Sequence, residues 1–130
     1  MASTQEQRSY ATRSLDYAHD VIAGRILACK WTKAAAKRHL DDLDRWNDAD
    51  SPYYFDPAAV EHVCGFVEAL PQIKGEWARR REYVRLENWQ VFILGVVFGW
   101  KRRIDGMRRF RIAYVECARK NGKSTMLAAI

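Results

Sequence analysis

In the first half of the chain, hydrophobic residues recur at spacings of three and four, which is the period of one helical face. Gly24 lies inside the first such stretch and is expected to bend or interrupt its helix. Asp56 and Pro57 predict the start of the third, because a carboxylate N-cap and a proline at the first helical position favour one. Residues 47–52 are expected to be a loop, and Pro71 is expected to end the third helix. We therefore expect three amphipathic helices that bury these apolar faces: Leu15, Ala18, Ile22 and Ile26; Ala36, Leu40, Leu43 and Trp46; Ala59, Val63, Phe66, Val67 and Leu70.

The second half contains a long apolar stretch, residues 86–100, whose type is ambiguous. Its β-branched and aromatic content favours a strand, but six of its apolar residues recur at helical spacing: Trp89, Phe92, Ile93, Val96, Val97 and Trp100. The length of the stretch favours a helix, so we expect a largely buried helix here. Further on, Asp105 and Gly106 predict a tight turn, residues 111–116 a short apolar strand, and residues 126–130 the start of another helix.

Composition and charge narrow the class of protein. A length of 130 residues, with 48% hydrophobic and 29% charged residues, is typical of one globular domain and excludes a disordered chain. The longest apolar run, residues 91–100, is too short to span a bilayer, and three scattered cysteines favour a reduced protein over a disulfide or zinc framework. Residues 1–70 carry 8 Lys and Arg against 11 Asp and Glu, whereas residues 71–130 carry 14 against 5. The basic second half indicates an anionic partner such as phosphate, nucleotide or nucleic acid.

A variant of the phosphate-binding loop follows the predicted strand. The pattern GxxxxGK[ST] has Cys117 here in its first glycine position and ends in Gly122, Lys123 and Ser124. Gly122 lets the backbone approach a phosphate, Lys123 supplies a point charge to the β- and γ-phosphates, and Ser124 can ligate Mg²⁺. Backbone N–H groups at the start of the following helix add donors. The alternative is a surface turn with a solvated lysine, and the order of strand, loop and helix start favours the phosphate site.

Residues 114–130 (YVECARKNGKSTMLAAI) resemble the Walker A segment of the large subunits of tailed-phage terminases. The resemblance extends to residues 17–43, 55–70 and 86–100 and to the basic run RRFR at 108–111. It implies a mainly α-helical N-terminal region, residues 1–75, that leads into the first strand and P-loop of an α/β ASCE-type P-loop ATPase. Residues 76–130 would form the start of this ATPase domain, which we expect to be truncated after the Walker A motif.

The same resemblance assigns ligands and roles. It implies that ATP and Mg²⁺ are bound, with Ser124 on the metal and Lys123 as the charge that stabilises the transition state. Gln90 matches the position of a glutamine that contacts adenine in these ATPases, although a glutamine at a helix start is more often solvated or a cap. The nucleotide-binding residues implied by the resemblance are Gln90, Arg119, Lys120, Asn121, Gly122, Lys123, Ser124 and Thr125.

The family packages DNA, which implies several partners and one compartment. We expect double-stranded phage DNA, the portal, the small terminase subunit, and the remainder of the ATPase or a homo-oligomeric ring, all in the host cytoplasm, and no membrane. The Walker B carboxylates and the nuclease carboxylates of the family lie downstream of the Walker A motif, so this chain alone is not expected to hydrolyse ATP efficiently. The strand at 111–116 also lacks parallel neighbours. The segment after Arg103 is therefore expected to be poorly ordered, docked unusually or dependent on a partner chain.

The alternative function is a stand-alone basic nucleic-acid-binding or assembly module without ATPase activity. Residues 79–81 and 101–103 are all basic, and Trp77, Tyr83 and Trp100 lie near them, as in surfaces that contact phosphates and bases. A solvated basic face explains the same runs equally well.

Metal and thiol chemistry is not expected. The acidic residues Asp41, Asp42 and Asp44 are interpreted as a solvated helix face, and His19, His39 and His62 have no neighbour at ligand spacing. For Cys117, a small buried residue at the end of a strand is favoured over a redox-sensitive thiol.

Overall fold

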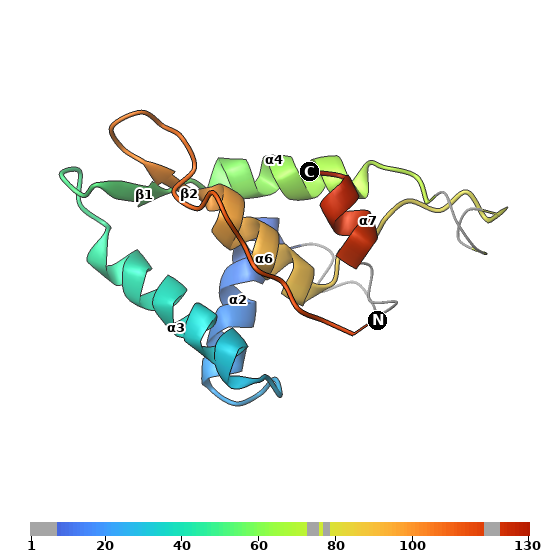
Figure 1. Ribbon diagram of the computed structural model, residues 1–130, viewed down its shortest axis with the longest axis horizontal. Helices are drawn as coiled ribbons and strands as arrows, with labels where there is room; N and C mark the ends of the chain where they lie inside the picture. The colour runs from blue at the N-terminus through green and yellow to red at the C-terminus, as the bar shows by residue number, and fades with distance from the viewer. Residues whose placement is uncertain (1–7, 73–75, 77–78, 119–122) are drawn as a thin grey trace.

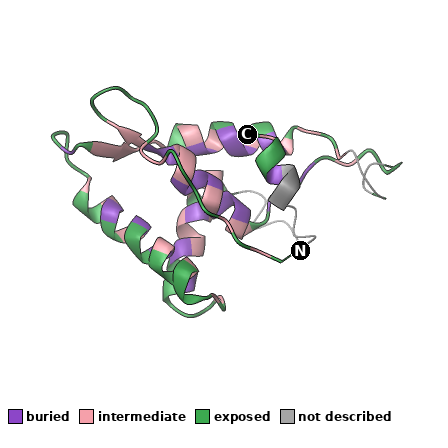
Figure 2. Ribbon diagram, in the orientation of Figure 1, coloured by how far each residue is buried: buried purple, intermediate pink, exposed green. Residues whose placement is uncertain are grey.

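Helix α6 (Asn88–Gly99) lies at the centre of the fold, and more than half of its residues are buried (Figure 2). The computed structural model describes residues 8–72, 76, 79–118 and 123–130. Helices α2 (Tyr10–Ile22) and α4 (Pro57–Glu68) pack on α6, and α3 (Lys30–Arg45) packs on α2 (Figure 1). The other elements are the short strands β1 (Tyr53–Phe55) and β2 (Trp100–Arg102) and the short helix α7 (Lys123–Ala128). The described structure is therefore mainly α-helical with one small sheet. The helix predicted for residues 86–100 is confirmed for residues 88–99, whereas Trp100 belongs to β2.

Two hydrophobic clusters share α6. Val91 and Leu94 belong to a cluster with buried residues of α4 and with Met126 of α7, whereas Phe92 and Val96 belong to one with α2, α3 and β2. At 100° per residue, these two pairs lie on different sides of the helix. A helix that is apolar on all sides has to be enclosed, which explains why α6 occupies the middle of the fold.

Glycines on α6 allow its neighbours to approach closely. A Cβ at Gly95 would lie 2.7 Å from Ser14 Oγ of α2, and one at Gly99 would lie 2.4 Å from Phe55 Cε2 of β1. Both distances are shorter than a normal van der Waals contact. The close packing of α2 on α6 and the position of the Phe55 ring therefore both require glycine, which has no side chain, at these two positions of α6.

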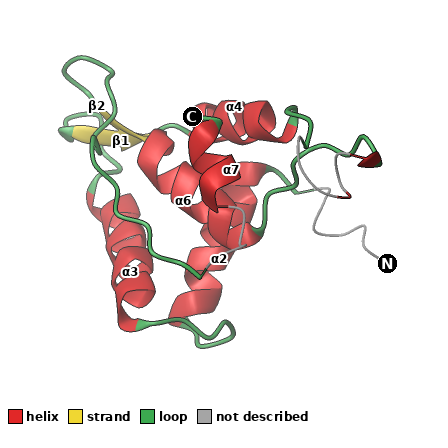
Figure 3. Cartoon of the chain, turned by 45° about the vertical axis from the view of Figure 1, so that its right-hand side comes forward, coloured by secondary structure: helices red, strands yellow, loops and turns green. Residues whose placement is uncertain are grey.

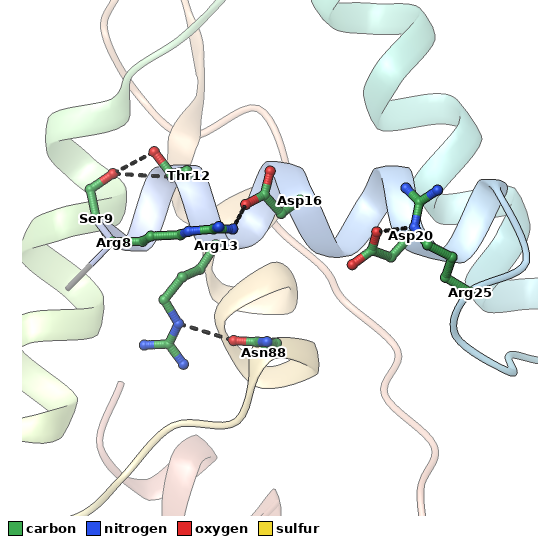
Figure 4. Close-up of polar contacts among 8 residues, drawn as sticks. All are labelled: Arg8, Ser9, Thr12, Arg13, Asp16, Asp20, Arg25 and Asn88. Carbon is green, nitrogen blue, oxygen red and sulfur yellow. Dashed lines mark hydrogen bonds and ion pairs between the residues drawn. The ribbon is translucent and has the colours of Figure 1, made fainter. Parts of the chain in front are cut away.

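Helix α2 is tied to the start of α6 by Arg13. Its Nε donates to Asn88 Oδ1 at 3.0 Å, and its guanidinium also donates to the carbonyl oxygen of Leu86 at 2.8 Å (Figure 4 shows the first contact). Ser9 caps α2 by accepting the backbone N–H of Thr12 at 3.2 Å. These contacts fix the first turn of α2 against the segment that enters α6.

The predicted apolar face of α2 is partly wrong. The helix ends at Ile22, and Gly24 follows with φ +81°, so the glycine interrupts the helix and Ile26 lies beyond it. Ile22 is 47% exposed, and the buried residues are Ser14, Ala18 and Val21. Ser14, Ala18 and Val21 follow one another at spacings of four and three, so they share one face of the helix. This face is rotated from the predicted one because it is set by the positions of α6 and α3, on which α2 packs.

Helix α4 begins as predicted. Asp56 is its N-cap and accepts the backbone N–H of Ala58 at 3.1 Å, and Pro57 is its first residue. The buried face contains Val60, Val63, Cys64 and Val67, which replaces the predicted Ala59 and Phe66. Phe66 is 52% exposed.

A two-stranded sheet joins the two halves of the chain, and the sequence pattern did not predict it. Strand β1 pairs antiparallel with β2, so that Phe55 lies opposite Trp100 and Tyr53 opposite Arg102. The predicted turn at Asp105 and Gly106 is confirmed, since Gly106 has φ +70° and donates to the carbonyl oxygen of Arg102 at 2.8 Å. The sheet thereby fixes where the chain leaves α6.

The predicted strand at 111–116 does not form in the described structure. Residues 112–118 are irregular and form a single extended segment, which passes in front of α6 in Figure 1 and runs between α3 and α6 in Figure 3. A strand requires a partner for its backbone hydrogen bonds, and no described segment supplies one. The expectation of unusual docking fits residues 112–118. Residues 100–109, in contrast, form a hairpin around the turn at Gly106, in which the N–H of Arg109 donates to the carbonyl oxygen of Trp100 and the N–H of Arg102 donates to that of Met107.

Candidate functional site

The predicted phosphate-binding residues lie largely outside the described residues. Arg119, Lys120, Asn121 and Gly122 belong to this undescribed part, and so do the side chains of residues 123–125. The backbone of α7 begins at Lys123. A helix therefore starts directly after Gly122, as a phosphate-binding loop requires, because the first N–H groups of a helix have no partner within it.

Both flanks of the predicted loop lie against the core around α6. Met126 on the C-terminal side is 1% exposed and shares a cluster with Val91 and Leu94. Cys117 on the N-terminal side is half-buried and lines a groove together with Trp89 and Ile93 of α6. Both flanks of the loop thus lie near one helix, α6, which also carries Gln90, and the C-terminal flank is the one held in its core cluster.

The groove has a volume of about 840 Å³ and three walls. Helices α2 and α3 form one wall, α6 forms the second, and residues 110–117 form the third. Its lining is mainly apolar and aromatic, and the charged groups on it are Arg38 and Glu116. Trp31 on its rim is 72% exposed. The groove is therefore the space against which the extended segment docks.

Gln90 caps its own helix. The side chain is at N3 of α6, and its Oε1 accepts the backbone N–H of Glu87 at 2.8 Å as half of a capping box. Gln90 is 5% exposed. The structural role that sequence reasoning considered more common is thus observed, and the contact with adenine stays a prediction.

An ion pair that sequence reasoning missed holds the start of the extended segment. Arg109 Nη1 lies 2.9 Å from Asp42 Oδ2 of α3, and the two side chains are 18% and 5% exposed. The Arg109 guanidinium also lies over the ring of Tyr53, with Cζ 4.4 Å from the centroid, and its backbone N–H donates to the carbonyl oxygen of Trp100 at 2.9 Å. The expectation of a solvated face is therefore wrong for Asp42. Only a partner 67 positions away in the sequence explains why this carboxylate is buried.

A buried histidine lies next to this ion pair. His39 is 2% exposed, and its Nδ1 accepts the indole N–H of Trp100 at 3.0 Å. The rings of Phe55 and Phe92 contact it edge-on. Burial lowers the pKa of His39 to about 4, against a smaller opposing effect of Asp42. His39 is therefore a neutral core residue at physiological pH.

Comparison with known proteins bears on residues 88–130, which run from the start of α6 to Ile130. They match the family model described as terminase large subunit, ATPase domain. Residues 88–130 belong to this terminase family. No curated protein and no solved structure matches the chain. The resemblance to terminase large subunits that the sequence indicated is confirmed for residues 88–130, which are called the terminase segment below.

Several basic residues of the terminase segment are engaged within the chain. Lys101 Nζ lies 2.7 Å from Asp56 Oδ2, which lowers the pKa of Asp56 and raises the pKa of Lys101. Arg102 pairs with Asp105 at 3.1 Å, and Arg103 Nε donates to the carbonyl oxygen of Ser51 at 2.8 Å. These contacts hold the hairpin in place. The basic side chains of residues 101–103 therefore have partners within the chain and do not form a solvated basic face.

The aromatic residues expected beside the basic runs differ in exposure. Trp100 is 1% exposed, so it cannot stack on a base in this structure. Tyr83 is 62% exposed, and Trp77 lies outside the described residues. Arg79 and Arg80 are exposed, and Arg80 pairs with Glu76 at 3.7 Å.

Other candidate chemistry is limited. Within the described ranges, no group of three His, Cys, Asp or Glu residues is placed to hold a metal ion. Asp41 and Asp44 are exposed as expected. Cys64 is fully buried, and burial raises the pKa of its thiol to about 12. No helix within the described ranges is long and apolar enough to cross a membrane.

Proposed function

We propose that this chain provides the ATP-binding segment of the large subunit of a phage DNA-packaging motor. The observation that carries the proposal is the family match over residues 88–130, which contains Gly122, Lys123 and Ser124 in phosphate-loop order. The start of α7 at Lys123 supports it, since the helix begins where the mechanism needs unpaired N–H groups.

In this proposal Arg119, Lys120 and Asn121 line the phosphate loop, and Gly122 allows the close approach of its backbone. Lys123 neutralises charge on the β- and γ-phosphates, and the hydroxyl of Ser124, next to Thr125, ligates Mg²⁺. When bound, the metal neutralises phosphate charge. Gln90 would contact adenine through its side-chain amide. To do so, the amide would either keep the hydrogen bond from the N–H of Glu87 that caps α6 or give it up for the nucleotide.

The proposal includes the organisation of the longer protein. Residues 1–75 form a helical region, and residues 76–130 form the first part of an α/β ASCE-type ATPase domain. The unpaired extended segment 112–118 supports this, because it has strand-type sequence and no described partner. The partners would be double-stranded DNA, the portal, the small subunit and neighbouring large subunits in the host cytoplasm.

The test is binding of Mg-ATP to the 130-residue chain by isothermal titration calorimetry. Lys123→Ala should weaken binding by about tenfold or more, since a charge-assisted contact to phosphate contributes about 1.5–3 kcal/mol. Lys33→Ala is the matched control, because Lys33 is exposed on α3. Equal affinity in all three proteins, or no binding to the wild-type chain at millimolar nucleotide, would contradict the proposal.

A further inference from the structure

The contacts of Arg109 are concentrated at one point of the chain. Its guanidinium pairs with the buried Asp42 at 2.9 Å and lies over three rings, with centroid distances of 4.4 Å to Tyr53, 4.9 Å to Phe110 and 5.5 Å to Trp100. Arg109 is thus bound to α3, β1 and β2 at once. Contacts with three elements fix both the position of Arg109 and the direction in which the chain continues after it.

The segment that follows has few other attachments. Residues 111–118 make no backbone hydrogen bond to any other described residue. Ile112 is 91% exposed and Tyr114 is 87% exposed, and the contacts of the segment with the body are those of its half-buried side chains along the groove. Phe110, beside Arg109, packs in the cluster of α2, α3 and α6, and Arg38 lies over its ring with Cζ 5.0 Å from the centroid. The path of the segment is therefore set mainly at Arg109.

The far end of the segment is the predicted phosphate loop. Ala118 is the last described residue of the segment, and α7 begins at Lys123 with Met126 buried in the core. Loss of the anchor at Arg109 would leave this loop tethered at its C-terminal side alone.

We propose that Asp42 and Arg109 are a positioning pair, which docks residues 110–117 on the groove and so fixes the segment that leads into the proposed phosphate-binding loop. The inference rests on the proposed function, and it adds that a carboxylate of the helical region controls a site in the terminase segment. The pair acts through the segment and touches no nucleotide. If docking is required for binding, the apparent dissociation constant rises in inverse proportion to the fraction of docked chain.

The test measures docking and nucleotide binding separately in the 130-residue chain. Docking is measured as the alkylation rate of Cys117 by N-ethylmaleimide, followed by peptide mass spectrometry. Cys64, which is 0% exposed, reports global unfolding in the same sample, and the exposed Cys29 reports reagent activity. Nucleotide binding is measured by calorimetry with Mg-ATP.

The main variant is Asp42→Asn, which keeps the shape of the side chain and removes its charge. The matched control is Asp41→Asn on the same helix, whose exposed carboxylate pairs with the exposed Lys37 at 2.5 Å. We expect Asp42→Asn to raise both the Cys117 rate and the Mg-ATP dissociation constant by about fivefold or more, with Cys64 still protected. Asp41→Asn should change neither quantity by as much as twofold.

Arg109→Lys keeps the charge but loses the planar group, and it is the second variant should Asp42→Asn not fold. It should raise the Cys117 alkylation rate and the Mg-ATP dissociation constant, because a lysine cannot reproduce the stacked guanidinium. Both increases should be smaller than those of Asp42→Asn, since the lysine keeps the positive charge.

An unchanged Cys117 rate in both variants would overturn the inference. So would a raised rate with unchanged nucleotide affinity, or a parallel rise at Cys64, which would show a purely structural role. If the wild-type chain itself binds no Mg-ATP, the proposed function fails, and with it the claim about nucleotide, while the alkylation rates still decide whether the pair docks the segment.

Discussion

Gly99 offers a sharp test of the packing around α6, because a single methyl group has no space there. A Cβ at this position would lie 2.4 Å from Phe55 Cε2, 2.9 Å from Phe55 Cζ and 3.0 Å from Val60 Cγ2. Carbon atoms in proteins rarely approach closer than about 3.4 Å, so the Phe55 ring would have to move by about 1 Å. The ring is confined by His39 and Trp100, whose centroids lie 5.3 and 5.4 Å away.

The expected cost follows from this confinement. Overpacking of a filled core typically costs about 1–3 kcal/mol, and Gly99 gains little helix propensity in return because it is the last residue of α6. Gly65→Ala is the matched control, since no atom lies within 4 Å of its Cβ position inside α4. That substitution should stabilise the protein by up to about 1 kcal/mol.

Urea unfolding followed by circular dichroism measures the free energy of unfolding of both variants. In a thermal unfolding experiment, each kcal/mol corresponds to a shift in Tm of about 4 °C for a chain of this length. Adding Phe55→Leu to Gly99→Ala should recover about 1 kcal/mol relative to the sum of the single effects, since leucine lacks the two ring atoms that clash. A free energy of unfolding for Gly99→Ala within about 0.5 kcal/mol of the wild-type value would refute the reasoning.

Two further predictions concern buried polar groups. The folded protein holds His39 neutral with a pKa of about 4, whereas the unfolded chain protonates it near pH 6.5, so stability should fall by about 3 kcal/mol as pH decreases from 6.5 to 4. His39→Asn keeps an acceptor for Trp100 and should flatten this part of the pH profile, and an NMR titration of His39 with a midpoint above 6 would contradict the assignment. Glu68 accepts the hydroxyl of Tyr10 and the backbone N–H of Leu86, so Glu68→Gln should cost about 1–3 kcal/mol in urea unfolding. Because burial and Glu68 both raise the pKa of Tyr10, ultraviolet titration of that variant should show it lowered, and an unchanged Tyr10 midpoint would count against the contact.

The helices were predictable because their signals are local. Asp56 and Pro57 mark the start of α4 by their own chemistry, and the length of residues 86–100, together with their apolar spacing, favours a helix over a strand. The buried faces were less predictable, since the difference between Val21 and Ile22 is one step of 100° around the helix. Which of the two is buried depends on where α6 lies, and that position is not encoded in the local pattern.

The sheet and the ion pair were unpredictable for a different reason. Strand β1 has three residues and acquires its structure only by pairing with β2, in which the partner of Phe55 is Trp100, 45 positions further on. Asp42 has the same local pattern as its exposed neighbours, and only the arrival of Arg109 makes its burial favourable. For the candidate site, the motif of the phosphate loop could be recognised from the sequence alone. The docking of the segment that precedes the loop could not be predicted, because it depends on these distant contacts.

The extended segment shows how local preference and context compete. Residues 111–116 have the β-branched and aromatic side chains of a strand, yet strand propensity is mainly a preference for a pleated, half-buried surface with hydrogen-bonding neighbours. The groove supplies burial on one side and no described partner supplies hydrogen bonds, so the segment is extended without being a strand. Its exposed Ile112 and Tyr114 then present apolar surface and unpaired backbone together. A neighbouring strand would satisfy both at once, and the anchor at Arg109 would already hold the segment in place to receive it.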